Sequence, residues 1–156
     1  MGRLIAMVKD DTLVGLMWPD REEATLAHLN RHRSMVRAID GDLPGSIAEP
    51  LSRYFSGSLK ALSAIEVNPA GTAFQRRVWR ELQAIPPGTA ASYADVAARL
   101  GCPTAVRAVA NANGRNPIPI VIPCHRVIAT GGGLGGFSSG ADRKEWLLRH
   151  ERFLTG

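Results

Sequence analysis

The chain has 156 residues, of which 45% are hydrophobic and 21% are charged, as in ordinary globular proteins. This length allows a sizeable core in one domain or in two small lobes. No apolar run approaches the length of a membrane-spanning segment. The apolar N-terminal run is interrupted early, by Asp10 and Asp11, which is not typical of a signal peptide. We therefore expect a cytoplasmic protein that does not enter membranes.

The net charge of +5 is unevenly distributed along the chain. Residues 1–70 are nearly neutral at −1, whereas residues 71–156 carry +6. Sixteen of the nineteen cationic side chains are arginine, whose planar fork suits phosphate groups. A basic C-terminal half indicates a polyanionic partner for that half. Charge by itself does not separate nucleic-acid-binding proteins from other basic proteins.

The cysteine and histidine content bounds the possible metal and redox chemistry. Two cysteines, Cys102 and Cys124, cannot form a disulfide framework or a Cys-rich zinc site. His28 and His32 have the spacing of paired ligands on a helix, but no third ligand is near them in the sequence. A solvated, arginine-rich helix face is the favoured interpretation. We expect no metal and no cofactor, and a packing or helix-capping role for Cys102.

The first seventy residues predict a small α+β lobe with a mainly antiparallel sheet. Residues 2–8 and 12–18 are expected to form two strands around a turn. Asp20 should cap a helix, with Glu23 in the capping-box position. Three further elements are expected, namely a strand over 34–39, a helix over 47–55 that is interrupted near its start by Pro50, and a strand over 61–67. Nothing in this lobe resembles a chemical site.

A second lobe is expected to begin with a well-defined helix after a link over residues 68–71. Thr72 and Gln75 have the spacing of a capping box. Apolar residues then recur at helical spacing, so this helix faces a core, at Phe74, Val78, Leu82 and Ile85. Trp79 is expected to pack in the same core, and Pro86 helps to end the helix.

Two shorter helices follow around a turn at residues 101–103, the first opening at Ser92 and the second covering residues 104–113. This is the format of a helix-turn-helix, although an ordinary helical hairpin has the same spacing. The second helix is rich in alanine and has one long cation, Arg107. Its slim face suits close approach to a backbone or minor groove better than base reading in the major groove. Small residues that merely permit tight helix packing are the alternative explanation.

The strongest chemical signal is an apolar run over residues 118–127 that ends with Cys124 beside His125. A reactive cysteine needs a neighbour that lowers the pKa of its thiol. Successive side chains on a strand point to opposite faces, so these two can cooperate only if the chain turns at Pro123 or if a water bridges them. Glu151 borders the apolar face of a final helix and could orient His125. A solvated carboxylate at the helix end is equally compatible with the sequence.

A glycine-rich segment over residues 130–140 follows the cysteine. It lacks the lysine of a phosphate-binding loop and does not stand between a clear strand and a G-x-G-x-x-G helix start. We interpret it as a loop whose backbone must come near a ligand or an active-site wall.

Several segments together resemble the O6-alkylguanine-DNA alkyltransferases, namely residues 74–79, 85–88, 92–93, 107–109, 116–127, 135–140 and 144–151. The resemblance is dense from Gly71 to Glu151, and its Pro-Cys-His-Arg-Val core is highly specific to that family. It implies a ribonuclease-H-like N-terminal lobe over residues 1–68. It also implies a winged-helix-like DNA-binding and alkyl-transfer domain over residues 71–156. The first 70 residues are compatible with such a lobe but carry little signal themselves.

The resemblance implies DNA repair by direct reversal. An alkyl group, commonly methyl, moves irreversibly from O6-alkylguanine, and also from O4-alkylthymine, in duplex DNA to Cys124. His125 and Glu151 would make the sulfur a thiolate through a water, and Tyr93 would help rotate the phosphate and protonate the departing guanine. Asn116 would brace the active-site loop. The thioether product does not hydrolyse at neutral pH, so one molecule repairs one lesion.

The resemblance also assigns residues to the DNA and to the flipped nucleotide. Arg107 resembles the arginine that fills the gap in the base stack as the helix enters the minor groove. The implied DNA-binding residues are Ser92, Tyr93, Arg107, Ala108 and Arg115, and the implied base pocket contains Pro119, Val127, Phe137 and Ser138. Phe137 stands where many members have tyrosine, so a hydroxyl contact is lost. The absence of a cysteine before Cys102 argues against the N-terminal zinc site of some relatives.

The expected partner is duplex DNA that carries alkylated guanine. We expect the protein to be a monomer that needs no other protein as a partner. Three alternatives remain. The alkyltransferase-like proteins bind lesions but have tryptophan at the acceptor position, so Cys124 argues against them. A Cys-His hydrolase usually has its nucleophile and base far apart in sequence. A transcriptional regulator with a structural cysteine would need a helix that reads bases more readily.

Overall fold

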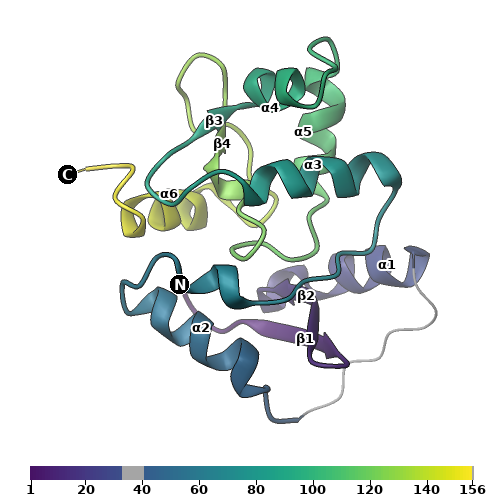
Figure 1. The fold of residues 1–156 in the computed structure, drawn as a ribbon, viewed down its shortest axis with the longest axis vertical. Coiled ribbons are helices and arrows are strands. Elements are labelled where there is room, and N and C mark those ends of the chain that lie inside the picture. The colour runs from purple at the N-terminus through teal and green to yellow at the C-terminus, as the bar shows by residue number, and fades with distance from the viewer. Residues whose placement is uncertain (33–40, 156) are drawn as a thin grey trace.

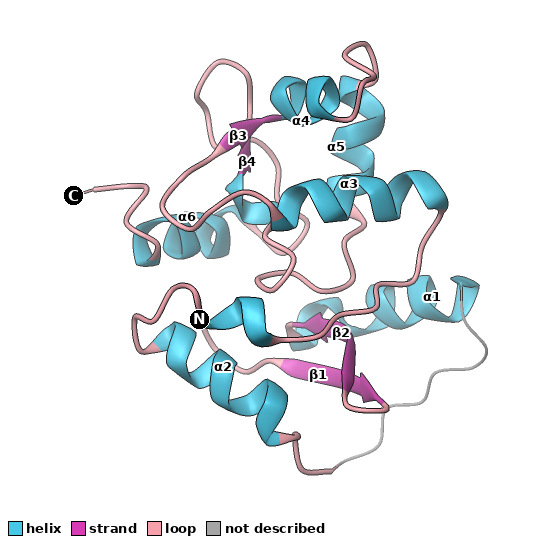
Figure 2. Ribbon diagram, in the orientation of Figure 1, coloured by secondary structure: helices cyan, strands magenta, loops and turns pink. Residues whose placement is uncertain are grey.

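The structure is a computed structural model that describes residues 1–32 and 41–155. It is a mixed helix-and-sheet fold in which helices dominate and the described strands form two small sheets (Figures 1 and 2). The elements up to residue 64 occupy the lower half of Figure 1, and the later ones form the upper half. The strand expected over residues 34–39 lies outside the described residues. No helix in the described ranges has the length and apolar character needed to cross a membrane.

The elements, in chain order, are β1 (Ile5–Lys9), β2 (Thr12–Met17), the 3-10 helix η1 (Pro19–Arg21), α1 (Glu22–His32), α2 (Gly45–Phe55), the 3-10 helix η2 (Ala61–Ala64), α3 (Ala73–Gln83), β3 (Ala91–Ser92), α4 (Tyr93–Arg99), α5 (Val106–Gly114), the 3-10 helix η3 (Cys124–Arg126), β4 (Val127–Ile128) and α6 (Ala141–His150).

The predicted N-terminal hairpin is confirmed. β1 and β2 pair antiparallel, and Lys9 stands opposite Thr12, so only Asp10 and Asp11 form the turn. Both have positive φ, at 49° and 57°, as a two-residue hairpin turn of type I′ requires. Aspartate tolerates this conformation better than most residues.

The helix after the hairpin begins differently from the prediction. Pro19 opens the short η1 turn, so Asp20 lies inside helical structure instead of ahead of it, and its side chain caps nothing. Its carboxylate instead forms an ion pair with Arg143, at 2.7 and 2.9 Å. The Arg143 guanidinium lies 4.8 Å from the centre of the Trp18 ring. The predicted cap is therefore wrong, and Asp20 joins the N-terminal segment to α6.

α2 runs without a break through Pro50, which the sequence led us to regard as an interruption. The proline removes one helical hydrogen bond, but the helix is held by the burial of one face, comprising Ile47, Leu51 and Tyr54. Tyr54 is completely buried at the end of this face. α2 therefore delivers a hydroxyl group into the interior.

The strand predicted over residues 61–67 is wrong. The chain forms the short helix η2 and then attaches to β2 at a single parallel bridge, between Leu13 and Val67. Two backbone hydrogen bonds of 3.0 Å make this bridge, from Leu13 to the Glu66 carbonyl and from Asn68 to the Leu13 carbonyl. The apolar residues that indicated a strand are buried by the turn of η2 instead, at Leu62 and Ile65.

The capping box predicted at Thr72 is present, and the helix predicted to open at Ser92 begins with a second one. Thr72 and Gln75 cap α3, and Ser92 and Asp95 cap α4, each with both reciprocal hydrogen bonds. Trp79 is fully buried and donates its indole N–H to the Ala112 carbonyl at 2.9 Å, which ties α3 to α5. α5 begins at Val106, two residues later than expected.

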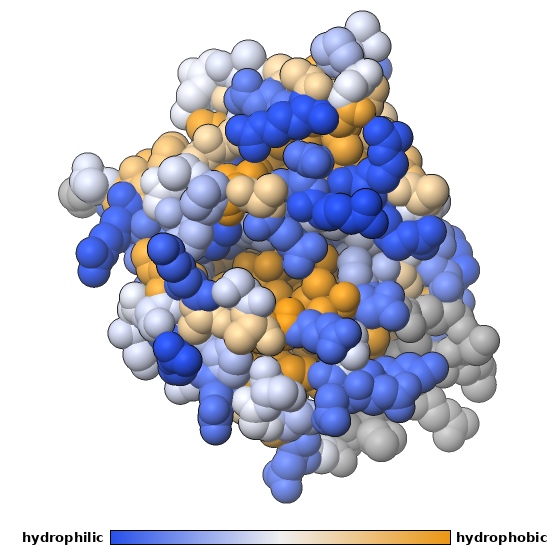
Figure 3. Space-filling model, in the orientation of Figure 1, coloured by the Kyte–Doolittle hydropathy of each residue, from blue (hydrophilic) through white to orange (hydrophobic). Residues whose placement is uncertain are grey.

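The larger of the two core clusters found among the described residues joins the two halves of the chain. It includes Leu16, Trp18 and Tyr54 from the first half, with Ile118 and Leu147 from the second. The face in Figure 3 accordingly shows apolar side chains in its centre, between hydrophilic ones. The division at residues 68–71 stays a prediction.

The short parallel sheet β3–β4 positions the chemistry. Ala91 pairs with Val127 and Ser92 with Ile128. The start of α4 therefore lies beside the turn that carries the cysteine.

Candidate active site

Cys124 opens a tight turn at Pro123, which is the first of the two arrangements that the sequence allowed. The Cys124 amide donates to the Ile122 carbonyl at 2.8 Å around Pro123, whose φ of −82° and ψ of 64° are those of an inverse γ-turn. Because the proline ring already restricts φ, this turn is favoured locally. The chain then continues as the 3-10 helix η3, so Cys124 and His125 no longer alternate as they would on a strand.

Asn116 holds the loop that precedes the cysteine. Its side-chain amide donates to the Ile122 carbonyl at 2.7 Å, and its carbonyl accepts from the Ile118 amide at 2.9 Å. Between them Ile120 has a φ of 76°, a strained conformation for a β-branched residue. The two Asn116 bonds therefore span a strained segment, as a bracing side chain must.

His125 and Glu151 form the pair that the sequence proposed. The imidazole Nε2 lies 3.0 Å from the Glu151 Oε1, and both side chains are fully buried. Because a carboxylate oxygen accepts hydrogen bonds, we assign the ring proton to Nε2, which donates it to Glu151. Nδ1 is then a hydrogen-bond acceptor. Within the described residues, this buried Nδ1 has no hydrogen-bond partner. It is therefore the free basic atom of the site.

Glu151 is the centre of a larger buried cluster than the sequence indicated. Arg126 donates to both of its oxygens, at 2.7 and 2.8 Å, and the Tyr54 hydroxyl donates to Oε1 at 2.7 Å. Burial opposes ionisation of Glu151, but the hydrogen bonds from Arg126 and His125 outweigh it and hold the pKa of this carboxyl below its usual range. Burial lowers the pKa of His125, so the imidazole is neutral at pH 7.

The state of the Cys124 sulfur differs from the expected thiolate. The residue is only 2% exposed, and burial raises the pKa of its thiol to about 11. The nearby Asn116 amide and the positive charge of Lys144 act in the opposite direction without overcoming it. In this closed state burial favours the neutral thiol at pH 7, and formation of the expected thiolate as substrate enters stays a prediction.

Lys144 is a site residue that the sequence analysis missed. Its side chain is fully buried, and its ammonium donates to the Val127 carbonyl at 2.6 Å and to the Gly136 carbonyl at 3.3 Å. Burial lowers its pKa to about 8, whereas Cys124 acts to raise it. The spacing of Lys144, Leu147, Leu148 and Glu151 places all four on one helix face. The argument that singled out Glu151 therefore applies equally to Lys144.

The glycine-rich loop approaches Tyr93, as its composition predicted. The Tyr93 hydroxyl donates to the Gly136 carbonyl over a long 3.4 Å. Gly135 has a φ of 68°, and a Cβ there would lie 3.5 Å from the Tyr93 ring and 3.4 Å from the Ala129 nitrogen. Both distances are those of ordinary contacts, so it is the positive φ that only glycine adopts without strain. Burial raises the pKa of Tyr93, so its hydroxyl is a proton donor at neutral pH.

The residues assigned to DNA lie at the start and end of two helices. Arg107 and Ala108 are exposed on the first turn of α5, and Arg115 is exposed just beyond its C-terminus. Ser92 is half-buried, and its hydroxyl already donates to the Asp95 carboxylate at 2.7 Å within the capping box. A contact of Ser92 with DNA would have to share that hydroxyl.

The residues assigned to the base pocket are only partly brought together. Val127 is buried and bonded through its carbonyl to Lys144. The Phe137 ring packs edge-on against Trp18, with 6.5 Å between ring centres. Pro119 and Ser138 both line a cavity beside α1, of which Cys124 is not a lining residue. Within the described residues, Pro119 and Ser138 therefore lie on a cavity that the sulfur does not line.

His28 is buried, so the expectation of a solvated helix face does not hold for this side chain. Its Nε2 lies 2.7 Å from the Ala70 carbonyl, and its ring lies 4.9 Å from that of His32. The described ranges contain no group of three or more side chains placed to hold a metal ion.

Comparison with known proteins identifies the family. The sequence model described as "6-O-methylguanine DNA methyltransferase, DNA binding domain" matches residues 73–153. The methylated-DNA--protein-cysteine methyltransferase of Salmonella typhimurium is 48% identical over 135 residues, or 86% of this chain and 78% of that protein. The counterpart from Shigella flexneri is 42% identical over 88% of this chain and 81% of its own length.

Solved structures agree with the sequence relatives. The crystal structure of Mycobacterium tuberculosis OGT in complex with DNA has a TM-score of 0.76 at 34% identity, covering 96% of this chain and 86% of that one. The O6-methylguanine-DNA methyltransferase of Pyrococcus kodakaraensis has a TM-score of 0.77 at 28% identity, covering 92% of this chain and 88% of that one. The chain with this buried Cys-His-Glu arrangement therefore belongs to the 6-O-methylguanine DNA methyltransferase family, the enzymes that repair methylated DNA by transferring methyl groups to a protein cysteine.

Proposed function

We propose that Cys124 is the acceptor and that it takes one alkyl group, irreversibly, from O6-alkylguanine or O4-alkylthymine in duplex DNA. The observation that carries this assignment is the place of Cys124 at the start of the turn that also holds the buried His125–Glu151 pair, where the charge of Lys144 acts on its thiol. Cys102, the other cysteine, lies in the turn between α4 and α5 and makes no side-chain hydrogen bond to another described residue.

The buried thiol must lose its proton as the substrate enters. His125 Nδ1 accepts that proton, directly or through a water, and Glu151 stabilises the imidazolium that forms. The Lys144 ammonium favours the thiolate electrostatically, because the two groups lie close together in a buried site. Glu151 itself stays ionised throughout, since Arg126 and Tyr54 both donate to it.

Transfer is then a single in-line displacement. The sulfur forms a bond to the alkyl carbon while the bond from that carbon to the guanine O6 breaks, and the electron pair leaves with the base. Tyr93 donates a proton to the departing guanine, which otherwise would leave as an anion. The thioether cannot be hydrolysed at neutral pH, so each protein molecule reacts once.

Delivery of the base requires DNA docking on α5. Arg107 and Ala108 are exposed at its start, and its small residues allow close approach to a minor groove. We propose that Arg107 occupies the gap left by the flipped nucleotide. Cys124 is 2% exposed, so the loop from Gly135 to Ser138 must move away from Tyr93 as the base enters.

The finer architecture belongs to the same proposal. Residues 1–68 form a ribonuclease-H-like lobe and residues 71–156 a winged-helix-like domain in which α4 and α5 are the helix-turn-helix. The protein acts as a monomer and without a cofactor, because no step above needs a second subunit or an added group. The cytoplasm is proposed as its place of action.

The test uses two cysteine variants and a duplex containing one O6-methylguanine. Cys124→Ser should bind the duplex and leave the lesion intact, whereas Cys102→Ser should repair it at the parent rate. Excess lesion should remain unrepaired once every Cys124 is used. Repair by Cys124→Ser, or continued repair beyond one lesion per protein, would overturn the proposal. Binding without repair by the parent would instead indicate a lesion-binding protein.

A further inference from the structure

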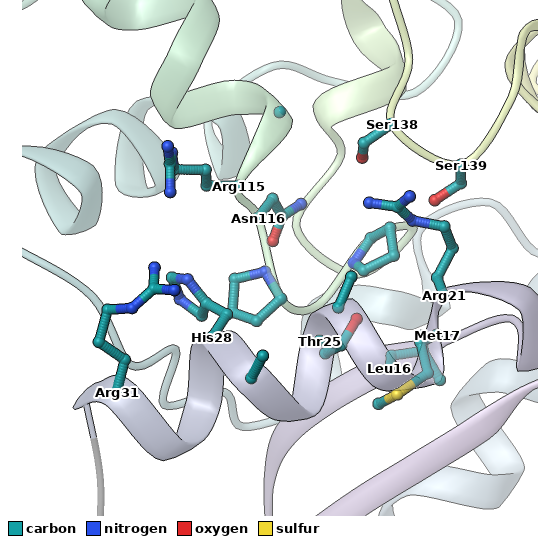
Figure 4. Close-up of a pocket in the computed structure, with 15 residues that line it drawn as sticks. Leu16, Met17, Arg21, Thr25, His28, Arg31, Arg115, Asn116, Ser138 and Ser139 are labelled. Carbon is teal, nitrogen blue, oxygen red and sulfur yellow. The ribbon is translucent and has the colours of Figure 1, made fainter.

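A second feature of the structure is a cavity of about 340 Å³ between α1 and the segment that follows α5 (Figure 4). Its volume lies in the range of small-ligand pockets. Three of its lining residues are arginines, namely Arg21, Arg31 and Arg115, and none is aspartate or glutamate. All the lining residues that are charged are therefore positive.

The three arginines come from different elements and converge on the same space. Arg31 and Arg115 lie on one side of the cavity and Arg21 on the other, with Asn116 between them (Figure 4). Among the described residues, none of the three forms an ion pair. The carboxylate next in sequence to Arg21, that of Asp20, is held by Arg143 instead. Asp20 and Arg21 still interact electrostatically, but no described carboxylate lines the cavity itself.

The positive charge of the arginines also affects His28, another residue that lines the cavity. Burial is the main cause that lowers the pKa of His28, and the charges of His32, Arg31 and Arg115 lower it further. The hydroxyl groups of Thr25 and Ser138 also face this space. Guanidinium forks with nearby hydroxyl donors are the usual protein partners of a phosphate group.

We propose that this cavity binds a phosphate group of the DNA backbone, a contact from the N-terminal half of the chain that adds to those of α5. The inference rests on the proposed function. Arg115 follows the C-terminus of α5 and lines the cavity, so the DNA contacts proposed for α5 would continue directly into it. Asn116 lines the cavity and also holds the Ile122 carbonyl, so the bound phosphate lies against the loop that carries Cys124.

Arg21→Gln and Arg31→Gln, combined in the full chain, test the site. Each DNA phosphate that the protein neutralises contributes about 0.9 to the salt slope and about tenfold in affinity at 0.1 M salt, and the cavity is proposed to hold one phosphate. The double variant should therefore bind an undamaged duplex at least about tenfold more weakly, with a salt slope lower by about one. Fluorescence anisotropy over a salt series measures both quantities.

The matched control removes two exposed cations of the same half, by Arg53→Gln and Lys60→Gln. An equal loss of affinity in this control would overturn the proposal, because general charge would then explain the effect. Arg21→Lys with Arg31→Lys should keep the salt slope while losing part of the affinity. This variant also replaces the glutamine variant if the latter fails to fold.

Inorganic phosphate separates the two possible sources of the ligand. If phosphate raises the melting temperature of the parent but not of the double variant, while DNA binding is equal in both, the cavity serves free phosphate and the proposal is wrong. Methyl transfer from the free modified base to Cys124 in the parent tests the proposed function separately. Its failure would leave the DNA-binding result for the cavity standing.

Discussion

Replacing Glu151 with glutamine removes one charge from the buried cluster and keeps its volume. The Arg126 guanidinium then loses a carboxylate partner that accepts two of its hydrogen bonds, at 2.8 and 2.7 Å. The Arg126 side chain is only 7% exposed, so water cannot replace that partner. Removing one member of a buried ion pair costs about 3–5 kcal/mol. We expect Glu151→Gln to lose stability of this size.

The loss is measurable in urea unfolding and in thermal melts. For a chain of this length, about 1 kcal/mol lowers the melting temperature by about 2–4 °C, so the variant should melt roughly 10 °C below the parent. The urea midpoint should fall with an unchanged m-value. A domain of ordinary stability, about 5–15 kcal/mol, remains folded after this loss.

The pH dependence of the difference follows from the lowered pKa of Glu151. Its ionised form contributes stability above the unfolded carboxyl pKa of about 4.3, and this contribution is lost as pH falls toward the lower pKa of the folded state. The stability gap between parent and variant should therefore be full at pH 7 and shrink below about pH 4.

Glu145→Gln is the matched control on the same helix. Glu145 is exposed and pairs with Arg149 at 2.8 Å, so its removal should cost less than about 1 kcal/mol. The reasoning about the cluster is refuted if Glu151→Gln destabilises the protein no more than Glu145→Gln does.

Three further predictions concern the surroundings of the sulfur. Tyr54→Phe removes one donor to Glu151, so it should cost about 1–3 kcal/mol in urea unfolding, and an unchanged midpoint would contradict the hydrogen bond. The rate of methyl transfer from free O6-methylguanine should change little between pH 6 and 8, because His125 is already neutral there and takes the thiol proton within the site, and should fall above pH 8, where Lys144 loses its charge. A tenfold rise per pH unit between pH 6 and 8 in a rapid-quench series would contradict proton transfer to His125. Gly135→Ala should cost about 1–3 kcal/mol and slow transfer, because a Cβ there is strained and meets Tyr93, whereas Gly133→Ala meets nothing within 4 Å and should behave as the parent.

Local features of this fold followed from the sequence alone. The capping boxes at Thr72 and Ser92 depend on residues three apart, and the hairpin turn depends on two adjacent aspartates, so neighbouring residues determine them. The pairing of His125 with Glu151 was also predictable, because a carboxylate on an apolar helix face needs a partner.

Long-range contacts explain what the sequence did not show. Tyr54 meets Glu151 across 97 residues of chain, and no local pattern marks it as a donor. Asp20 pairs with Arg143 across 123 residues, which overrides its local preference for a helix cap. The neutral state of the Cys124 thiol depends on burial by the assembled core, which residue types cannot report. Lys144 could have been found, since it shares the helix face of Glu151.

The identity of the acceptor sulfur is tested most directly by peptide mapping after reaction. The protein is incubated with excess duplex containing O6-methylguanine, digested, and analysed by mass spectrometry. The account predicts one methyl group per chain, on Cys124 within the peptide that contains His125. A methyl group on Cys102, or an unmodified Cys124 after complete repair, would contradict it.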